Sequence, residues 1–178
     1  MKEKENFEEC YIKYANKIYG VAYKMVNNHQ DAVDIVQEVF LRAYKNWNNF
    51  KGLSQISTYL YRIAVNLSYN FLKKRKRFKK IENKDFENWQ KFSSNVKFED
   101  CVRDEELVDE IKKEIDNLTE KQKAIFILKT FEELKYEEIA NILKKRVGTV
   151  KATYFQSLQK IRENLKKKGV IKNELQKG

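Results

Sequence analysis

The absence of proline limits the fold of this chain more than any other feature: none occurs in 178 residues, and there are only five glycines. Proline and glycine end helices and build the tight turns between strands, so a chain with so few of them offers little signal for hairpins. Lys, Glu, Leu, Ile and Asn dominate segments whose apolar residues recur at helical spacing. The sequence predicts an all-α protein, and 42% hydrophobic residues suffice for one ordinary domain or two small ones.

The net charge of +11 is unevenly distributed along the chain. Residues 1–80 carry 16 basic and 7 acidic side chains, residues 81–117 carry 6 and 12, and residues 118–178 carry 15 and 7. Two basic blocks flanking an acidic one indicate a polyanionic partner. Helical patterning stops after the run FLKKRKRFKK and resumes near Glu105. We therefore expect two small helical domains, residues 1–80 and 105–178, joined by an acidic linker over residues 81–104.

Several classes of protein have no support in the sequence. Cys10, Cys101 and the single histidine, His29, provide neither a metal-ligand cluster nor a disulfide framework. There is no P-loop, no GxGxxG and no nucleophile–base pair, so we expect no enzyme, no cofactor and no metal. A signal core and an apolar run of roughly 18 residues are also absent. We expect a cytoplasmic protein that does not insert directly into membranes.

The C-terminal block contains the pattern of a helix-turn-helix. Thr119-Glu-Lys-Gln122 has the form of a capping box, which predicts a helix that buries Ile125, Phe126 and Leu128. The next helix carries Tyr136, Ile139, Ala140 and Leu143 at i, i+3, i+4 and i+7. After Lys144-Lys145-Arg146 the apolar pattern restarts, with Val147, Val150, Tyr154 and Leu158 predicted to point inward. So short a turn between two helices is typical of this DNA-binding motif.

The second helix of this motif is expected to face DNA. Its outward side combines short polar, amide, cationic and apolar groups, the types that reach base edges and thymine methyls in the major groove. The residues on this side are Thr149, Lys151, Ala152, Thr153, Phe155 and Gln156. Amphipathic helix pairs are common in proteins of every kind, but the basic turn and the charge distribution favour nucleic acid here.

The N-terminal block contains two further amphipathic segments. DAVDIVQEVFLRAYKNW is predicted to bury Ala32, Val36, Val39, Phe40 and Ala43, and its opposite face places Leu41 among Asp34, Gln37, Glu38 and Lys45. A leucine in the middle of a polar face indicates a protein contact. ISTYLYRIAVNLSYNFLKKRKR is predicted to bury Ile56, Leu60, Ile63, Ala64, Leu67 and Phe71, leaving Arg62, Asn66, Tyr69, Asn70 and Lys73 on the other side. Cations, amides and a ring interleaved along one helix suit the binding of a nucleic acid, although such a face can also be merely solvated.

Together, DAVDIVQEVFLRAYKNW, FKGLSQISTYLYRIAVNLSYNFLKKRKR and LTEKQKAIFILKTFEELKYEEIANILKKRVGTVKATYFQSLQKIRENL resemble the extracytoplasmic-function (ECF) sigma factors, which contain only regions two and four of the sigma-70 family. The resemblance implies a dissociable subunit of bacterial RNA polymerase that recognises promoters and helps open them. It also implies an anti-sigma factor as a partner. The linker would run toward the polymerase RNA channel, where the acidic residues 81–117, which carry 6 basic and 12 acidic side chains, are hypothesised to mimic nucleic acid.

The resemblance implies three sets of site residues. The polymerase-binding set is Asp34, Gln37, Glu38 and Leu41. The set for the minus-ten element is Asn49, Lys51, Tyr59, Arg62, Asn66, Tyr69, Asn70, Lys73 and Arg75, with a flipped base held in the loop after Trp47. The set for the minus-thirty-five element is Arg146, Thr149, Lys151, Ala152, Thr153, Phe155 and Gln156.

Some positions depart from the family pattern. Lys144 stands where the turn commonly carries glycine, and because a left-handed lysine costs about 1–2 kcal/mol we expect this turn to be built differently. Thr153 and Gln156 replace arginines that are frequent in the recognition helix, which implies fewer contacts to phosphate or guanine. Tyr59 replaces a usual tryptophan and Asn70 a usual aspartate.

An alternative interpretation is a free-standing helix-turn-helix regulator, because LTEKQKAIFIL, YEEIANIL and VGTVK also resemble the DNA-binding domain of LuxR-type activators. Such regulators usually carry a sensing or receiver domain, and the N-terminal half of this chain shows no alternating strand–helix pattern. A regulator of that kind should bind duplex DNA unaided, whereas an ECF sigma factor should depend on core polymerase.

Overall fold

The computed structural model describes residues 6–47, 56–79 and 105–171, and these residues form helices without any strand. The helices are α1 (Phe7–Val26), α2 (His29–Lys45), α3 (Ile56–Lys79), α4 (Glu105–Asp116), α5 (Glu120–Thr130), α6 (Tyr136–Leu143) and α7 (Val147–Lys167). The prediction of an all-α protein is confirmed. The acidic linker, Asn49, Lys51 and Cys101 lie outside the described residues.

The described helices form two compact units. The first contains α1, α2 and α3, and the second contains α4, α5, α7 and the start of α6, while Ala140–Lys144 group with the first. None of the described helices is long and apolar enough to cross a membrane.

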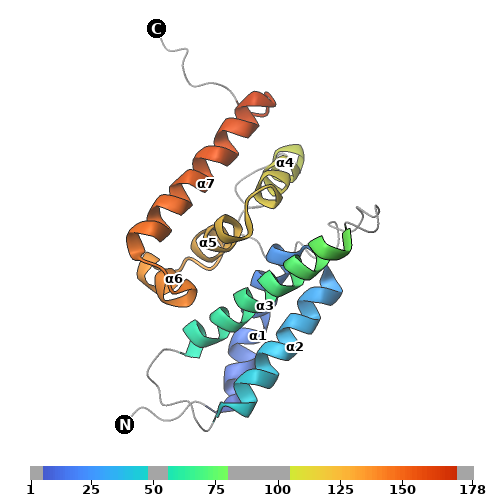
Figure 1. Ribbon diagram of the computed structural model, residues 1–178, viewed down its shortest axis with the longest axis vertical. Helices are drawn as coiled ribbons and strands as arrows, with labels where there is room; N and C mark the ends of the chain where they lie inside the picture. Colours follow the sequence, from blue (N-terminus) through green and yellow to red (C-terminus); the bar gives the residue numbers. More distant parts are fainter. Residues whose placement is uncertain (1–5, 48–55, 80–104, 172–178) are drawn as a thin grey trace. The chain divides into compact units, whose positions relative to one another are not determined.

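The three helices of the first unit pack against one another, as Figure 1 shows. α2 starts with a cap, because the Asn28 side-chain oxygen accepts from the Asp31 amide at 2.9 Å. Its predicted apolar face is confirmed except that Ile35 is fully buried and Val36 is only half-buried. The buried residues on α1, α2 and α3 are Cys10, Ile18, Val21, Ala22, Met25, Val26, Ala32, Ile35, Val39, Phe40, Ala43, Leu60, Tyr61, Ala64, Val65, Leu67 and Ser68.

On α3, the predicted burial of Leu60, Ala64 and Leu67 is confirmed. The prediction is wrong for Ile56, Ile63 and Phe71, which are only half-buried. Tyr61, Val65 and Ser68 complete the buried face instead, and the Ser68 hydroxyl donates to the Ala64 carbonyl at 2.8 Å. The buried stripe of α3 is therefore rotated from the predicted one toward Tyr61 and Val65, because small and amphipathic side chains also fill the interior.

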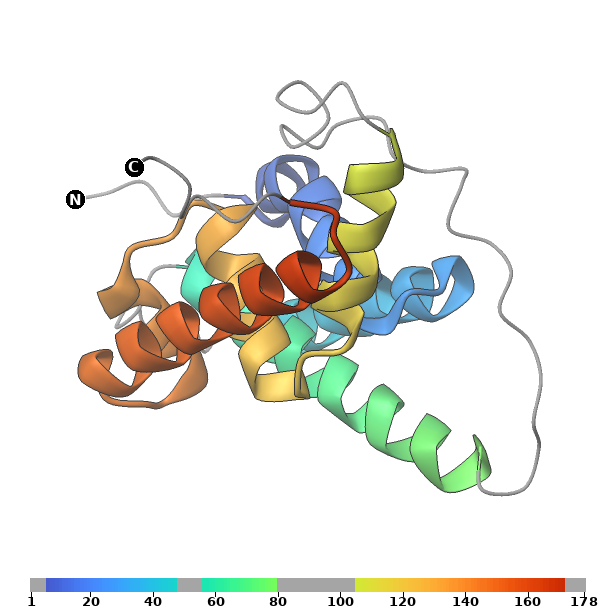
Figure 2. The same cartoon turned by 90° about the horizontal axis from the view of Figure 1, so that it is seen from above.

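In the second unit, α4 and α5 both lie against α7 (Figure 2). The predicted capping box is confirmed. The backbone N–H of Gln122 donates to the Thr119 hydroxyl at 3.3 Å, and the backbone N–H of Thr119 donates to the side-chain oxygen of Gln122 at 3.2 Å. Ile125, Phe126 and Leu128 are buried as predicted. One core cluster of this unit consists of Ile115, Leu118, Phe126, Ile161 and Leu165, with Ile111, Phe131, Tyr154, Val170 and Ile171 packed around it.

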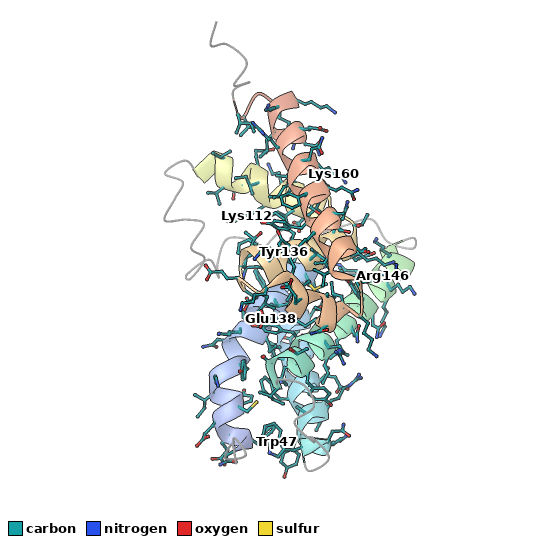
Figure 3. All side chains as sticks on the ribbon, turned by 90° about the vertical axis from the view of Figure 1, so that its left-hand side faces the viewer. Trp47, Lys112, Tyr136, Glu138, Arg146 and Lys160 are labelled. Carbon is teal, nitrogen blue, oxygen red and sulfur yellow. The ribbon has the colours of Figure 1, made fainter. Side chains whose placement is uncertain are left out.

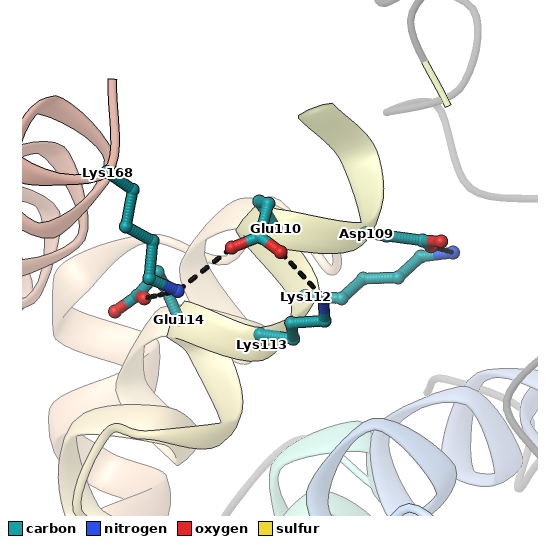
Figure 4. Close-up of polar contacts among 6 residues, drawn as sticks. All are labelled: Asp109, Glu110, Lys112, Lys113, Glu114 and Lys168. Atoms are coloured by element: carbon teal, nitrogen blue, oxygen red, sulfur yellow. Dashed lines mark hydrogen bonds and ion pairs between the residues drawn. The ribbon is translucent and has the colours of Figure 1, made fainter. Parts of the chain in front are cut away.

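A charged network joins α4 to the end of α7, as Figure 4 shows. The Lys168 ammonium lies 2.7 Å from the Glu114 carboxylate, which is 2% exposed, and 2.9 Å from that of Glu110. Asn164 donates to Glu114 at 2.6 Å, and Lys113 pairs with Glu110 at 2.6 Å. Burial raises the pKa of Glu114, but the hydrogen bonds from Lys168 and Asn164 outweigh it, so this pKa lies below its usual value. Hydrogen bonds from Lys113 and Lys168 lower the pKa of Glu110 to about 2.

This network predicts an acid-sensitive contribution to stability. Because both carboxyl groups have a folded pKa below 4.5, their contribution is complete above that pH and is lost as the pH falls through the folded values. We expect Lys168→Met, which removes the ammonium from both carboxylates, to unfold at a lower temperature than the wild type at about pH 6. The difference should shrink at about pH 3, as followed by circular dichroism. An unchanged difference between the two pH values would contradict this role of the network.

Candidate nucleic-acid and protein interfaces

The turn between α6 and α7 is built around a left-handed lysine. α6 starts with the Lys135 amide donating to the Glu138 carboxylate at 2.7 Å and ends at Leu143. Lys144 then adopts φ 52°, so the expectation of a differently built turn is wrong. Arg146 is extended, and its carbonyl accepts from the Val150 amide at 3.1 Å to begin α7. The chain thus reverses within Lys144-Lys145-Arg146, which gives the predicted helix-turn-helix.

The left-handed conformation of Lys144 should be less favourable for lysine than for glycine. A non-glycine residue at positive φ is strained by about 1–2 kcal/mol, while glycine loses more chain entropy on folding by roughly 0.5–1 kcal/mol. We therefore expect Lys144→Gly to stabilise the chain by up to about 1 kcal/mol, measured by urea unfolding. Lys145→Gly is the matched control, because Lys145 does not have a positive φ, and it should not stabilise. A destabilised Lys144→Gly variant would show that the left-handed turn is not strained.

The outward face of α7 lies largely where the sequence predicts it. Thr149, Lys151, Ala152, Phe155 and Gln156 are exposed, and Thr153 is half-buried. Arg146 is exposed immediately before α7, as labelled in Figure 3. Because the three exposed residues Ala152, Phe155 and Gln156 stand at i, i+3 and i+4, they share one side of the helix.

The inward face of α7 is only partly as predicted. Val150 is fully buried, and Val147 and Tyr154 are half-buried. Leu158, which was predicted to point inward, is 37% exposed. Ser157 is buried in its place and donates its hydroxyl to the Thr153 carbonyl at 2.7 Å. Since Ser157 stands three residues after Tyr154 and four before buried Ile161, a small residue continues the buried stripe and leaves the leucine outside.

Tyr136, at the start of α6, contacts Tyr154 of α7, and two lysine ammonium groups lie near its ring. Its ring lies 6.0 Å from the ring of Tyr154 in an edge-on arrangement. The Lys129 and Lys151 ammonium groups lie 4.9 and 5.5 Å from the centroid of the Tyr136 ring. Two cations therefore flank this half-buried ring, labelled in Figure 3, beside the exposed face of α7.

The outward face of α2 presents an apolar side chain among charged and amide groups. Leu41 is 47% exposed, and Asp34 and Gln37 are exposed. Glu38 pairs with Arg42 at 2.6 Å, and Gln30 donates to Asp34 at 3.2 Å. The structure thus places all four residues of the predicted polymerase-binding set on one helix, with Leu41 accessible to a partner.

The predicted minus-ten residues on α3 fall into two groups, one exposed and one half-buried. Asn66, Asn70 and Lys73 are exposed. Tyr59, Arg62, Tyr69 and Arg75 are half-buried. The Arg75 guanidinium donates to the Val26 carbonyl at 3.0 Å, which ties α3 to the end of α1. Arg75 therefore has a structural contact in addition to its predicted role.

The predicted site residues omit three residues that the structure places on the faces of α2 and α7: Arg42 and Tyr44 on α2, and Tyr136 beside α7. Tyr44 is 65% exposed and stands one turn after Leu41, and Arg42 is paired with Glu38. The spacing of three between Leu41 and Tyr44 could have indicated the first of them. The sequence places Tyr136 only in the apolar pattern of its helix, and its contact with Lys151 depends on the tertiary fold. Among the residues that the structure describes, no group of three His, Cys, Asp or Glu side chains could hold a metal ion.

Two family models match the chain. One, described as Sigma-70 region 2, matches residues 10–78, and the other, described as Sigma-70, region 4, matches residues 109–161. The chain is 34% identical to the RNA polymerase sigma-H factor of Pseudomonas aeruginosa, over 89% of this chain and 86% of the relative. It is also 34% identical to the ECF RNA polymerase sigma factor SigW of Bacillus subtilis, over 92% of this chain and 91% of the relative.

Solved structures share the fold. The sigma factor RpoE, crystallised with the anti-sigma factor NepR from Bartonella quintana, superposes with a TM-score of 0.71 at 20% identity, over 90% of this chain and 96% of that chain. The chain described as CnrH, in complex with the cytosolic domain of CnrY, gives a TM-score of 0.65 at 14% identity, over 90% of this chain and 87% of that chain. At these identities the likeness concerns the fold.

Proposed function

Because the chain belongs to the ECF sigma factors of the sigma-70 family, which direct core RNA polymerase to promoters, we propose that its exposed helix faces divide polymerase binding and promoter recognition between them. The protein is a transcription initiation factor and not an enzyme. The free-standing regulator considered above does not account for the region 2 match over residues 10–78.

The outward face of α2 is proposed to bind core polymerase. The observation that carries this assignment is the exposed Leu41 within a surface of Asp34, Gln37 and Glu38. An accessible apolar side chain ringed by polar groups is the arrangement of an interface anchor, because the rim excludes water from the buried contact. The ion pair from Arg42 holds the Glu38 carboxylate beside this anchor.

The outward face of α3 is proposed to bind the minus-ten element. Asn66 and Asn70 provide amides for base edges, Lys73 provides a cation for phosphate, and half-buried Tyr59 and Tyr69 provide rings on which an unstacked base could lie. Asn49 and Lys51 belong to this proposal by their place in the sequence. Opening DNA requires bases to leave the stack, and contacts of these kinds offset that cost.

The outward face of α7, together with Arg146, is proposed to bind the minus-thirty-five element in the major groove. Its support is the exposure of Thr149, Lys151, Ala152, Phe155 and Gln156 along a helix that follows a short basic turn.

An anti-sigma factor is proposed as a further partner, because the fold neighbour RpoE was crystallised with one. The two units and the intervening segment are proposed to act as separate domains with a linker.

The electrostatic part of this proposal predicts a steep dependence on salt. If the two basic blocks neutralise about eight phosphates, the logarithm of the promoter binding constant should fall against the logarithm of salt concentration with a slope near −7. The measurement compares holoenzyme with core polymerase alone on one duplex promoter fragment. Lys73→Gln or Lys151→Gln should each make the slope measured with holoenzyme less negative by about 1. A sigma-dependent slope near zero would contradict nucleic-acid binding by these blocks.

Promoter binding with and without core polymerase tests the assignment as a whole. We expect specific retention of promoter fragments by the protein and core together, and none by the protein alone at the same concentration. Specific retention by the protein alone, unaffected by core, would favour a free-standing regulator.

A further inference from the structure

Two of the cations on and around the exposed face of α7, Lys151 and Lys160, are held by contacts within the second unit. The Lys151 ammonium lies 5.5 Å from the Tyr136 ring centroid, and the Lys160 ammonium donates to the Asn117 carbonyl at 3.1 Å. Reading guanine usually requires a cation aimed at the O6 and N7 atoms of the base. Both lysines are instead directed toward other parts of their own unit.

Two glutamines stand on α7, and only one is engaged. The Gln159 amide donates to the Glu163 carboxylate at 2.9 Å. Gln156 is exposed, and its side chain makes no hydrogen bond with any residue that the structure describes. A glutamine amide matches the N6 donor and N7 acceptor of adenine with two hydrogen bonds. Gln156 is therefore the amide on this face that is available for a base edge.

Apolar groups lie beside Gln156 on the same side of the helix. Ala152 precedes it by one turn, and Phe155 is 60% exposed with its ring edge-on to Tyr154 at 5.9 Å. Exposed apolar side chains in the major groove contact the methyl group of thymine. Because four residues of helix rise about 6 Å, Ala152 and Gln156 span roughly two base-pair steps.

We propose that the exposed face of α7 reads adenine–thymine pairs, with the Gln156 amide hydrogen-bonded to an adenine and Ala152 and Phe155 against the methyl group of a neighbouring thymine. This inference rests on the proposed binding of the minus-thirty-five element by α7. It makes Gln156 a specificity residue of this chain and gives the base that it selects.

The test uses holoenzyme assembled from core polymerase and the full-length protein. A promoter located on native genomic fragments is rebuilt with six randomised base pairs in its minus-thirty-five element, and templates that yield transcripts are sequenced. The wild type should enrich adenine at one position by about tenfold over guanine. Gln156→Ala should reduce that preference to less than about twofold and leave the other positions unchanged. Gln156→Arg should shift the preference at that position to guanine.

Gln159→Ala is the matched control, since it removes the same amide from a residue that is already engaged by Glu163. Its base profile should equal that of the wild type. An unchanged profile for Gln156→Ala, or a wild-type preference for guanine at the affected position, would overturn the inference while leaving the sigma function intact. A failure of the wild-type holoenzyme to initiate on any template would instead overturn the proposed function itself.

Discussion

Leu41→Ala is expected to weaken binding to core RNA polymerase by about 30-fold without unfolding the chain. Truncating an interface anchor commonly costs about 2 kcal/mol or more, which corresponds to this change in affinity. The side chain of Leu41 is 47% exposed in the free protein, so its removal leaves little cavity in the core. The measurement is competition between unlabelled variants and fluorescently labelled wild-type protein for core polymerase, together with circular dichroism of the free variant.

Ile12→Ala is the matched control for this prediction. Ile12 is 78% exposed on α1 of the same unit and lies outside the proposed polymerase face. Its replacement removes a similar exposed apolar side chain and should leave the affinity within about twofold of the wild type. Equal losses for the two variants would show that the effect reflects general surface apolarity. No loss for Leu41→Ala would contradict the assignment of α2 as the polymerase-binding helix.

Val150→Asp is expected to unfold the second unit. Val150 is fully buried at the first turn of α7, and an unpaired carboxylate there would cost about 4 kcal/mol or more. Domains of this size have a total stability on the order of 5 kcal/mol, so little stability would remain. We expect circular dichroism to show loss of helix from the second unit, and transcription that depends on the minus-thirty-five element to fall at least tenfold.

The matched control is Leu158→Asp, the same kind of change on the same helix. Because Leu158 is 37% exposed and Ser157 occupies the buried position, an aspartate at residue 158 remains in contact with solvent. This variant should keep its helices. Unfolding by Leu158→Asp to the same extent as by Val150→Asp would contradict the orientation of α7. Binding of the Val150→Asp variant to core polymerase should persist through α2, and its loss would contradict independent folding of the units.

Local patterns in the sequence predicted the fold and much of the exposed faces. The Thr119 capping box and the short basic turn are encoded by neighbouring residues, so a single stretch of sequence was sufficient to predict them. The exposed position of Leu41 also follows from the periodicity of one helix. The resemblance to ECF sigma factors then connected these faces to partners that periodicity alone does not name.

The features that the sequence did not predict correctly are ones that the hydrophobic pattern does not determine. Tyr154 and Ile161 are compatible with either Ser157 or Leu158 on the buried stripe, and the structure buries the serine, whose hydroxyl donates to the Thr153 carbonyl and is therefore not left without a partner. Lys144 adopts a left-handed conformation despite its side chain, because the connection between α6 and α7 requires that reversal. The Glu114–Lys168 contact joins residues more than fifty positions apart, which no local pattern encodes.

Run-off transcription on fragments of the native genome, using bacterial core RNA polymerase with and without this protein, shows most directly whether α2 is the polymerase-binding helix of a promoter-directing subunit. We expect discrete transcripts that appear only when the protein is present, and that disappear with Leu41→Ala while persisting with Ile12→Ala. If the protein instead shifts duplex DNA by itself and core polymerase gains no initiation on any fragment, α2 does not have this role.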